Sequence, residues 1–273
     1  MPDTSRNTSV DARQNELLAI VRQRGYVSIE AMANRFAVST QTIRRDIKTL
    51  SGQKLLERHH GGAGLPPGTD TLAYTSRKVR HALEKQLIGR LVARQIPNGA
   101  SLFIDIGTTT EAVAEALVNH RELRVVTNHI GVASMLSEHT DFEIVLTGGR
   151  VRKRDQAVTG EASADFLQRF KVTYGIFGIG TIDSDGDLLD YDYRDVQVSC
   201  TAIANSRKRF IVMDKSKFYG DAMIKVGHLR QVDALFTDGP PPADVQRLLR
   251  ANKVKLHVPM RRRADAPPGD GAR

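Results

Sequence analysis

Between residues 101 and 258, short apolar runs alternate with stretches of helical spacing, and few folds accommodate that order. Apolar runs of strand length lie at 101–106, 124–127, 143–147, 174–178, 209–213, 234–237 and 255–258. Helical patterns separate them, starting near Glu111 and Ile130 and covering 162–170, 193–205 and 243–251. Such alternation is typical of βαβ units around a mostly parallel sheet. The sequence therefore predicts an α/β, Rossmann-like domain over residues 79–260.

A long helix is predicted ahead of this sheet. The apolar residues from Val79 to Ile96 keep helical spacing, with Leu83 and Leu87 among them, and a Pro-Asn-Gly stop follows. We expect this helix to pack on the body of the domain. The Pro-Pro-Gly cluster after Leu65 indicates a domain boundary, and residues 65–78 are predicted to be a linker.

The first 60 residues have a different pattern, which predicts three short amphipathic helices. They are predicted over 11–24, over 29–36 after the N-cap Ser28, and over 40–51 after the N-cap Ser39. In the third helix Ile43, Ile47 and Leu50 face inward, which turns the polar and basic side chains outward. This order predicts a winged helix-turn-helix over residues 13–64.

The outward side chains of the third helix suit duplex DNA. In the major groove Gln can pair with adenine and Arg with guanine, while hydroxyl groups and the helix N-terminus favour phosphates. We expect Gln41, Arg44 and Arg45 to read bases, and a wing after residue 54 to contact the backbone. The predicted DNA-binding residues are Ser39, Thr40, Gln41, Thr42, Arg44, Arg45, Lys48, Arg58 and His59.

The distribution of charge agrees with this division. Of the formal net charge of +9, +4 falls on residues 1–60 and +2 on residues 261–273, which leaves +3 for the 200 residues between. A polyanion is therefore expected to bind the front of the chain. Residues 1–12 are predicted to be a flexible N-terminus, and residues 261–273 a disordered, Arg-rich tail.

Polar residues follow the predicted strands at the edge where parallel sheets bind ligands. The first strand ends in an Asp-Ile-Gly-Thr-Thr-Thr segment, and the helix N-terminus after it would hold an anion. Four more strand ends carry small, hydroxyl, amide or cationic residues, so one pocket for a small phosphorylated ligand is predicted. The predicted effector-binding residues are Asp105, Gly107, Thr108, Thr109, Thr110, Thr127, Asn128, Gly148, Gly149, Gly180, Asp183, Lys215 and Lys217.

Other chemistries find no support in the sequence. The loop from Asp183 to Asp187 lacks the glycine and glutamate that a calcium loop requires, so no metal site is expected. No GxxxxGK[ST] loop is present, and the lone Cys200 cannot form a disulfide within the chain. With 40% hydrophobic residues, no long apolar run and no apolar signal core, we expect a folded cytoplasmic protein without membrane segment or cofactor.

Two sets of motifs resemble one family. VSTQTIRRDIKTL and LLERHHGGA are similar to the signature of the DeoR family of bacterial transcription regulators, whose N-terminal winged helix binds operators. NGASLFIDIGTTTEAVAEAL, LRVVTN, GEASADF and MDKSKF resemble the sensor domain of that family, and the resemblance covers residues 13–258.

The resemblance implies a sensor with a ribose-5-phosphate-isomerase-like fold and a sugar- or polyol-phosphate effector, for which glycerol 3-phosphate is the expected compound. Carried over by motif, the phosphate would contact Gly107, Thr108 and Thr109, with Lys217 as counter-charge. Asp105, Asn128 or Asp183 would then lie near the hydroxyl groups.

Three functions stay open at this point. The leading hypothesis is a repressor that binds operator half-sites as a dimer or tetramer and leaves the DNA when its effector binds. An isomerase fused to a DNA-binding module is the main alternative, with Asp105, Asp183 or Asp185 as the proton-transferring carboxylate. A nonspecific, charge-driven nucleic-acid binder is the third.

Overall fold

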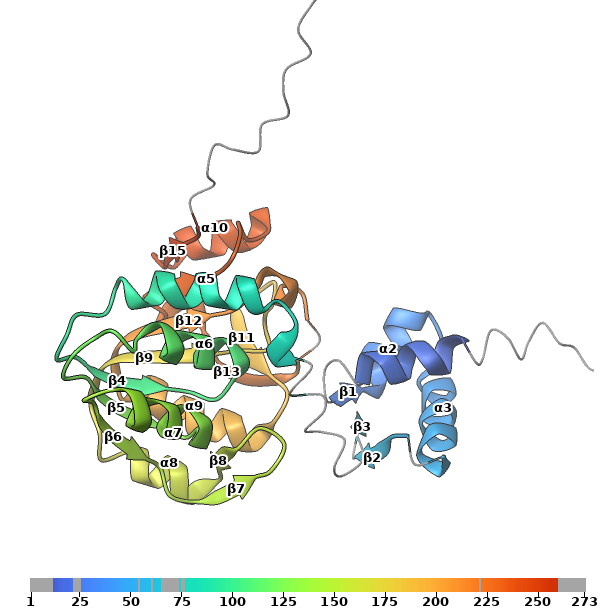
Figure 1. Ribbon diagram of the computed structural model, residues 1–273. Coiled ribbons are helices and arrows are strands. Elements are labelled where there is room, and N and C mark those ends of the chain that lie inside the picture. The colour runs from blue at the N-terminus through green and yellow to red at the C-terminus, as the bar shows by residue number, and fades with distance from the viewer. Residues whose placement is uncertain are drawn as a thin grey trace, which may run out of the picture.

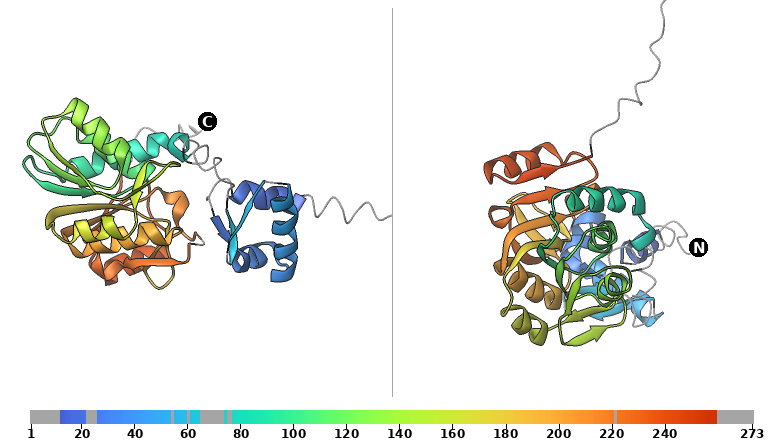
Figure 2. Two further views of the ribbon diagram at one scale, coloured as in Figure 1. Left: turned by 90° about the horizontal axis from the view of Figure 1, so that it is seen from below. Right: turned by 60° about the vertical axis from the view of Figure 1, so that its left-hand side comes forward.

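The computed structural model describes residues 12–21, 26–53, 55–59, 61–64, 74, 77–220 and 222–259. It contains a small N-terminal part of helices with a short sheet and a larger α/β part (Figure 1 and Figure 2). The flexible start, the arginine tail and most of the linker that the sequence predicts lie outside the described residues. Among the described residues, no helix has the length and apolar character needed to cross a membrane.

The N-terminal part is a winged helix-turn-helix. A helix at 12–21 is followed by β1 (Tyr26–Ser28), α2 (Ile29–Phe36), α3 (Thr40–Gly52), β2 (Glu57–His59) and β3 (Gly62–Gly64). The Ser28 hydroxyl accepts the Ala31 N–H at 3.1 Å and the Ser39 hydroxyl accepts the Thr42 N–H at 3.2 Å, so both predicted N-caps are confirmed. Left-handed Ala37, with φ 51°, makes the turn between the helices.

The three helices share one apolar core, in which Leu17, Met32 and Ile43 are fully buried. The Asp46 carboxylate on α3 also accepts the guanidinium of Arg13 at 2.7 Å, which ties the first helix to the third. The wing has three strands in the order β1-β3-β2. Its strand β1 was not predicted, because three residues are too few to show a period.

The larger part is built on a seven-stranded sheet in which every pair of neighbours is parallel, which confirms the predicted fold class. The strand order is β15-β14-β12-β9-β4-β5-β6. The strands are β4 (Ser101–Ile104), β5 (Arg124–Thr127), β6 (Glu143–Leu146), β9 (Val172–Gly178), β12 (Ser206–Val212), β14 (Ala234–Phe236) and β15 (Lys255–His257). From β4 the chain proceeds outward through β5 and β6 and then returns to β9 on the other side.

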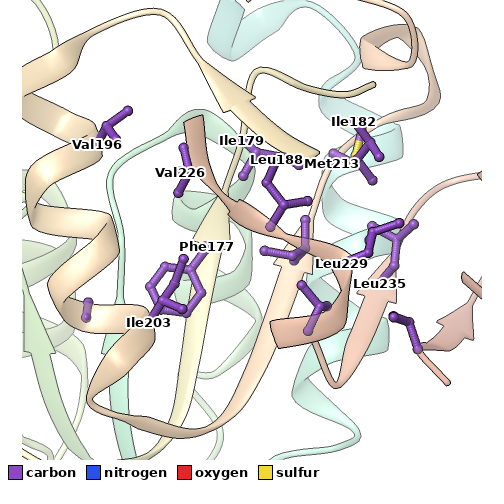
Figure 3. Close-up of a cluster of buried hydrophobic side chains, with 14 of the residues drawn as sticks. Phe177, Ile179, Ile182, Leu188, Val196, Ile203, Met213, Val226, Leu229 and Leu235 are labelled. Carbon is purple, nitrogen blue, oxygen red and sulfur yellow. The ribbon is translucent and has the colours of Figure 1, made fainter. Parts of the chain in front are cut away.

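Helices cover both faces of this sheet. They are α5 (Ala82–Ala93), α6 (Thr108–Ala116), α7 (Ile130–His139), α8 (Glu161–Leu167), α9 (Tyr193–Ala204) and α10 (Ala243–Ala251). Because side chains alternate along a strand, Leu102 and Ile104 of β4 enter the core under α5, α6 and α7, whereas Phe103 enters the opposite core. Figure 3 shows part of that opposite core, where Ile203 of α9 lies near Phe177.

Five short strands were not predicted. β7 (Arg150–Arg152) and β8 (Ala157–Thr159) form a hairpin, while β10 (Thr181–Ile182), β11 (Asp187–Asp190) and β13 (Ile224–His228) form a small antiparallel sheet. Charged residues dominate β7 and both ends of β11, so their apolar pattern is weak. Leu188 and Val226 nevertheless bury this small sheet against the main core (Figure 3).

The predicted helix does pack on the body, but it begins later than the apolar pattern indicates, and its first apolar residues lie outside the core. Val79 and Leu83 are 72% and 73% exposed, and Leu87 is also exposed. His81 has a left-handed backbone, with φ 56°, so α5 begins only at Ala82 and the register from Val79 is interrupted. Within α5, residues such as Ile88 and Val92 face the sheet and are fully buried.

We predict that Gly89→Ala destabilises the protein by about 1–3 kcal/mol, because a Cβ on this α5 residue would overlap the carbonyl oxygen of Ala112 in α6. Urea unfolding gives the free energy. Gly52→Ala is the control, since it also replaces a helical glycine but has open space around the new methyl group. Equal stability changes in the two variants would show that the contact between α5 and α6 does not require glycine.

Candidate DNA-binding face and effector cavity

The outer face of α3 carries the predicted base-reading residues. Gln41, Arg44, Arg45 and Lys48 are exposed, while Ile43, Ile47 and Leu50 beneath them are buried. None of these basic side chains forms an ion pair with a carboxylate in the described part of the chain. The helix therefore presents free cationic and amide groups beside its N-terminus, where Ser39 and Thr42 share a hydroxyl contact of 2.9 Å.

The wing places one further predicted residue on the surface. Arg58 is exposed in β2 and pairs in register with Ala63 of β3. His59 belongs to the same strand, but its side chain lies outside the described residues. Thr40, the remaining predicted contact, is the first residue of α3 and is partly exposed.

A cavity of about 620 Å³ lies at the carboxyl ends of β4 and β9, where the strand order reverses. This position is the one at which open α/β sheets bind ligands. Of the predicted effector residues, Gly107, Thr108, Thr109, Gly180 and Lys217 line it. The sequence thus identified three of the strand ends that form the cavity, those of β4, β9 and β12.

One end of the cavity has the chemistry of an anion site. Gly107, with φ 138°, turns the chain into the N-terminus of α6, whose first N–H groups are unpaired within the helix. The hydroxyl of Thr109 is buried and has no hydrogen-bond partner in the described structure. The ammonium of Lys217 donates to the carbonyl of Ile179 at 2.9 Å, and burial lowers its pKa. An anion here would meet a helix terminus, a hydroxyl and a cation.

The opposite wall is charged and is held together by ion pairs. Arg152 of the β7–β8 hairpin donates to Asp155 at 2.7 Å, to Asp192 at 2.8 Å and to Asp195 at 2.8 Å. Arg154 also pairs with Asp155 at 3.4 Å and with Asp192 at 3.2 Å, so two guanidinium groups and three carboxylates hold one another and give this wall a fixed shape. Tyr74 and Arg77, which precede α5, complete the lining from a third side.

Asp105 lies behind the cavity and does not line it, contrary to the prediction. Its carboxyl is 1% exposed and accepts the Ser199 hydroxyl at 2.6 Å and the Ile106 N–H at 2.8 Å. Burial raises the pKa of Asp105 to about 7, and the two hydrogen bonds only partly oppose that shift. The residue supports the end of β4 from inside.

Two predicted strand ends do not reach the cavity, because other elements cover them. The Val158 N–H of β8 donates to the carbonyl of Asn128 at 2.7 Å, and the Thr127 hydroxyl donates to the carbonyl of Ile104 at 2.7 Å. At the end of β6, Ser163 of α8 donates to the carbonyl of Gly148 at 2.7 Å. Thr127, Asn128, Gly148 and Gly149 are therefore absent from the cavity lining.

Three further predicted effector residues have local roles instead. Asp183 accepts the N–H groups of Asp185 and Asp187, at 2.9 and 2.8 Å, and shapes the turn between β10 and β11. Lys215 is exposed and lies 3.7 Å from Asp238. The Thr110 hydroxyl donates to the carbonyl of Gly107 at 2.8 Å, inside the first turn of α6.

Most of the charged residues that line the cavity were not predicted from the sequence. The missed residues come from α5 and the segment before it, from the β7–β8 hairpin, from the end of β11 and the start of α9, and from the loop after β12. They include Tyr74, Arg77, Arg80, His81, Lys85, Arg152, Arg154, Asp155, Asp190, Asp192, Asp195, Asp214 and Ser216. The dense run of charges from Arg150 to Asp155 was the one visible signal, since such a run is unusual between two strands.

Comparison with known proteins agrees with both parts of the structure. Residues 13–68 match the DeoR-like helix-turn-helix domain, and residues 80–239 match the DeoR C terminal sensor domain. The chain belongs to the DeoR family. As a member of that family it is a DNA-binding transcriptional repressor.

Several relatives named as repressors match this DeoR-family protein over nearly their whole length. The glycerol-3-phosphate regulon repressor of Escherichia coli (strain K12) is 48% identical over 246 residues, which cover 90% of this chain and 98% of that protein. The protein of the same name from Haemophilus influenzae is 45% identical, covering 89% and 95%. The HTH-type transcriptional repressor CsqR of Escherichia coli is 40% identical, covering 90% and 95%. These relatives support a regulator and not an isomerase.

A solved structure, ribose 5 phosphate isomerase A from Neisseria gonorrhoeae, aligns with 50% of this DeoR-family chain and 53% of its own. The TM-score is 0.37 and the sequence identity is 14%. The assignment of the fold therefore depends on the strand order and on the family match.

We predict that Asp105→Asn flattens part of the pH dependence of stability. In the folded state the pKa of Asp105 is about 7, above its ordinary 3.8, so the folded protein holds this proton more tightly. The wild type then loses stability, relative to the variant, as the pH rises from about 4 to about 7, by up to about 4 kcal/mol. Urea unfolding of both proteins across this range measures the difference, and a constant difference would contradict the prediction.

Proposed function

We propose that this DeoR-family protein represses genes of glycerol 3-phosphate metabolism and leaves its operator when glycerol 3-phosphate occupies the cavity. The observation that carries the effector proposal is the buried, unpartnered hydroxyl of Thr109 at the N-terminus of α6. A buried polar group without a partner is costly, and a phosphate oxygen would satisfy it. The names of the relatives favour the same compound.

On the DNA side, α3 would enter the major groove and the wing would contact the backbone. The exposed side chains of Gln41, Arg44 and Arg45 lie within the first two turns of α3, which is the part of a recognition helix that reaches base edges. Lys48, Arg58 and the hydroxyl groups of Ser39, Thr40 and Thr42 would hold phosphates.

Inside the cavity, the phosphate would bind the N–H groups of α6 with Thr108 and Thr109, opposite Lys217. The hydroxyl groups of the polyol would face the carboxylates of the opposite wall, where Asp155, Asp192 and Asp195 line the cavity. Carboxylates accept hydrogen bonds from hydroxyl groups, so a wall of this kind suits a polyol.

Release would be a shift of population between two arrangements of a homo-oligomer. In one arrangement two winged helices match the spacing of the operator half-sites, and in the other they do not. A coupling of about 1–3 kcal/mol between effector and operator changes operator affinity by roughly 5- to 150-fold. That range is sufficient for a metabolic switch.

The direct test is a gel shift of the purified protein on DNA upstream of its own gene and neighbouring genes. Glycerol 3-phosphate is expected to release the DNA, and glucose 6-phosphate is not. Specific binding should exceed binding to scrambled duplex by about 10³-fold or more. Equal affinity for operator and scrambled DNA would instead indicate a nonspecific, charge-driven binder.

We predict that Arg45→Ala weakens operator binding by about 1–3 kcal/mol and leaves binding to scrambled DNA almost unchanged, because a bidentate contact to guanine would be lost. Fluorescence anisotropy on both duplexes measures this. Arg35→Ala is the control, since Arg35 lies on α2 and pairs with Glu16 at 3.0 Å. An equal loss on both duplexes would mean that Arg45 binds phosphate.

We predict that Thr109→Val abolishes the response to glycerol 3-phosphate and leaves operator binding intact, since valine keeps the shape of threonine without its hydroxyl. Operator release in a gel shift is the measurement. Thr237→Val is a matched control, because the Thr237 hydroxyl is likewise buried without a partner but lies outside the cavity. An unchanged response of Thr109→Val would remove this hydroxyl from the phosphate site.

A further inference from the structure

Tyr74 makes an unusual contact for a residue placed between two folded parts. It follows Gly64, the last residue of the wing, by ten positions and precedes α5. Its hydroxyl donates to Oε1 of Glu111 at 2.6 Å and lies 2.9 Å from Nε2 of His129. The connection between the DNA-binding part and the sensor is therefore attached to a buried polar cluster of the sensor.

The cluster is organised around the carboxylate of Glu111. Nδ1 of His129 accepts the Val132 N–H at 3.2 Å, so Nε2 carries a proton and faces Glu111, 3.1 Å away. Lys78 lies 3.0 Å from the other carboxylate oxygen. Although burial opposes it, these hydrogen bonds lower the pKa of Glu111 to about 2. The carboxylate stays charged, and Tyr74 is one of the three groups paired with it.

Glu111 belongs to the helix that bounds the anion site. It lies in the first turn of α6, and its N–H donates to the carbonyl of Gly107 at 2.9 Å. Thr108 and Thr109, which line the cavity, precede it in the same turn. Tyr74 is therefore bonded to the helix turn at which we expect the phosphate to bind.

Arg77 connects the cluster around Glu111 with the cavity. Its guanidinium lies 5.5 Å from the centre of the Tyr74 ring, and both residues line the cavity. Lys85 of α5 donates to the backbone carbonyls of Arg77 and Arg80, which fixes this part of the chain to the sensor. Glu57 and Gly64 of the wing also line the cavity. An anion in the cavity would attract Arg77 and disturb the ring that it covers.

We propose that Tyr74 is the positioning residue through which occupation of the cavity is transmitted to the DNA-binding part. This inference rests on the proposed function, because it assumes an anionic effector at the N-terminus of α6. With the cavity empty, the hydrogen bonds to Glu111 and His129 hold Tyr74 in one position. Attraction of Arg77 to the effector weakens that attachment, and the DNA-binding part, which is joined to Tyr74 through the chain, is released with it.

The test compares Tyr74→Phe with Tyr219→Phe in the full-length protein. Tyr219 is a matched control because its hydroxyl also donates to a carboxylate, that of Asp244 at 2.5 Å, on the exposed surface. Two quantities are measured for each protein: the Kd for glycerol 3-phosphate without DNA, and the ratio of operator Kd values with and without saturating glycerol 3-phosphate. The wild-type ratio is expected between about 5 and 150.

For Tyr74→Phe the expected result is a ratio below about 3, with a Kd for glycerol 3-phosphate within about 3-fold of the wild type. Tyr219→Phe should match the wild type in both quantities. A Tyr74→Phe protein that keeps the wild-type ratio overturns the proposal, and so does one that no longer binds glycerol 3-phosphate, since Tyr74 would then be a ligand contact.

Hydrogen exchange tests the attachment through Tyr74 independently of the effector's identity, because the measurement needs no ligand. In the free protein, Tyr74→Phe should speed the exchange of amides at 77–81 and in the first turn of α6 by about 10-fold, whereas Tyr219→Phe should not. Unchanged exchange overturns the attachment through Tyr74 even if glycerol 3-phosphate releases the wild type. If glycerol 3-phosphate does not release the wild type, the proposed effector fails, and with it the transmission step.

Discussion

The parallel pairing of β4 with β9 is the constraint on which the sensor depends. From β4 the chain builds outward to β6, and it must then return past β4 to begin the second half of the sheet at β9. The connection after β4 leads to β5 and the connection after β9 leads to β12, on opposite sides of this pair. Neither of these two crossovers therefore covers the carboxyl ends of β4 and β9. The groups that would hold an anion, Gly107, Thr108, Thr109 and Lys217, follow strands next to this opening.

The helices that border this opening must also lie close together. Gly89 allows α5 to approach the backbone of α6 at Ala112, and this approach fixes the position of the α6 N-terminus relative to the residues before α5. The same approach brings Tyr74 and Lys78 within hydrogen-bond distance of Glu111. The anion site, the ion-paired wall and the residues before α5 are thus parts of one arrangement.

The elements with long apolar periods could be predicted from the sequence, and the lining of the cavity could not. Helix α2 and helix α10 have the predicted bounds, because their burial follows a 3.6-residue period. The β7–β8 hairpin was missed because three-residue strands show no period, and it is this hairpin that closes β5 at Asn128. The prediction that all the polar strand ends share one pocket is wrong, because elements such as this hairpin cover the ends of β5 and β6. Asp183 and Lys215 were misplaced for a related reason, since their positions depend on turns that pattern alone does not orient.

The ion pair between Arg13 and Asp46 also affects how the protein meets DNA. Asp46 directly follows Arg45 on α3, and a free carboxylate there would repel the phosphates that its neighbours attract. This carboxylate instead lies inward, where Asp46 is 3% exposed and accepts hydrogen bonds from the side chains of Arg13 and Gln14. The bond that fastens the first helix thus also screens the only acidic group of α3 from the polyanion. Loss of Arg13, a residue outside the recognition helix, would therefore weaken binding to every DNA sequence alike.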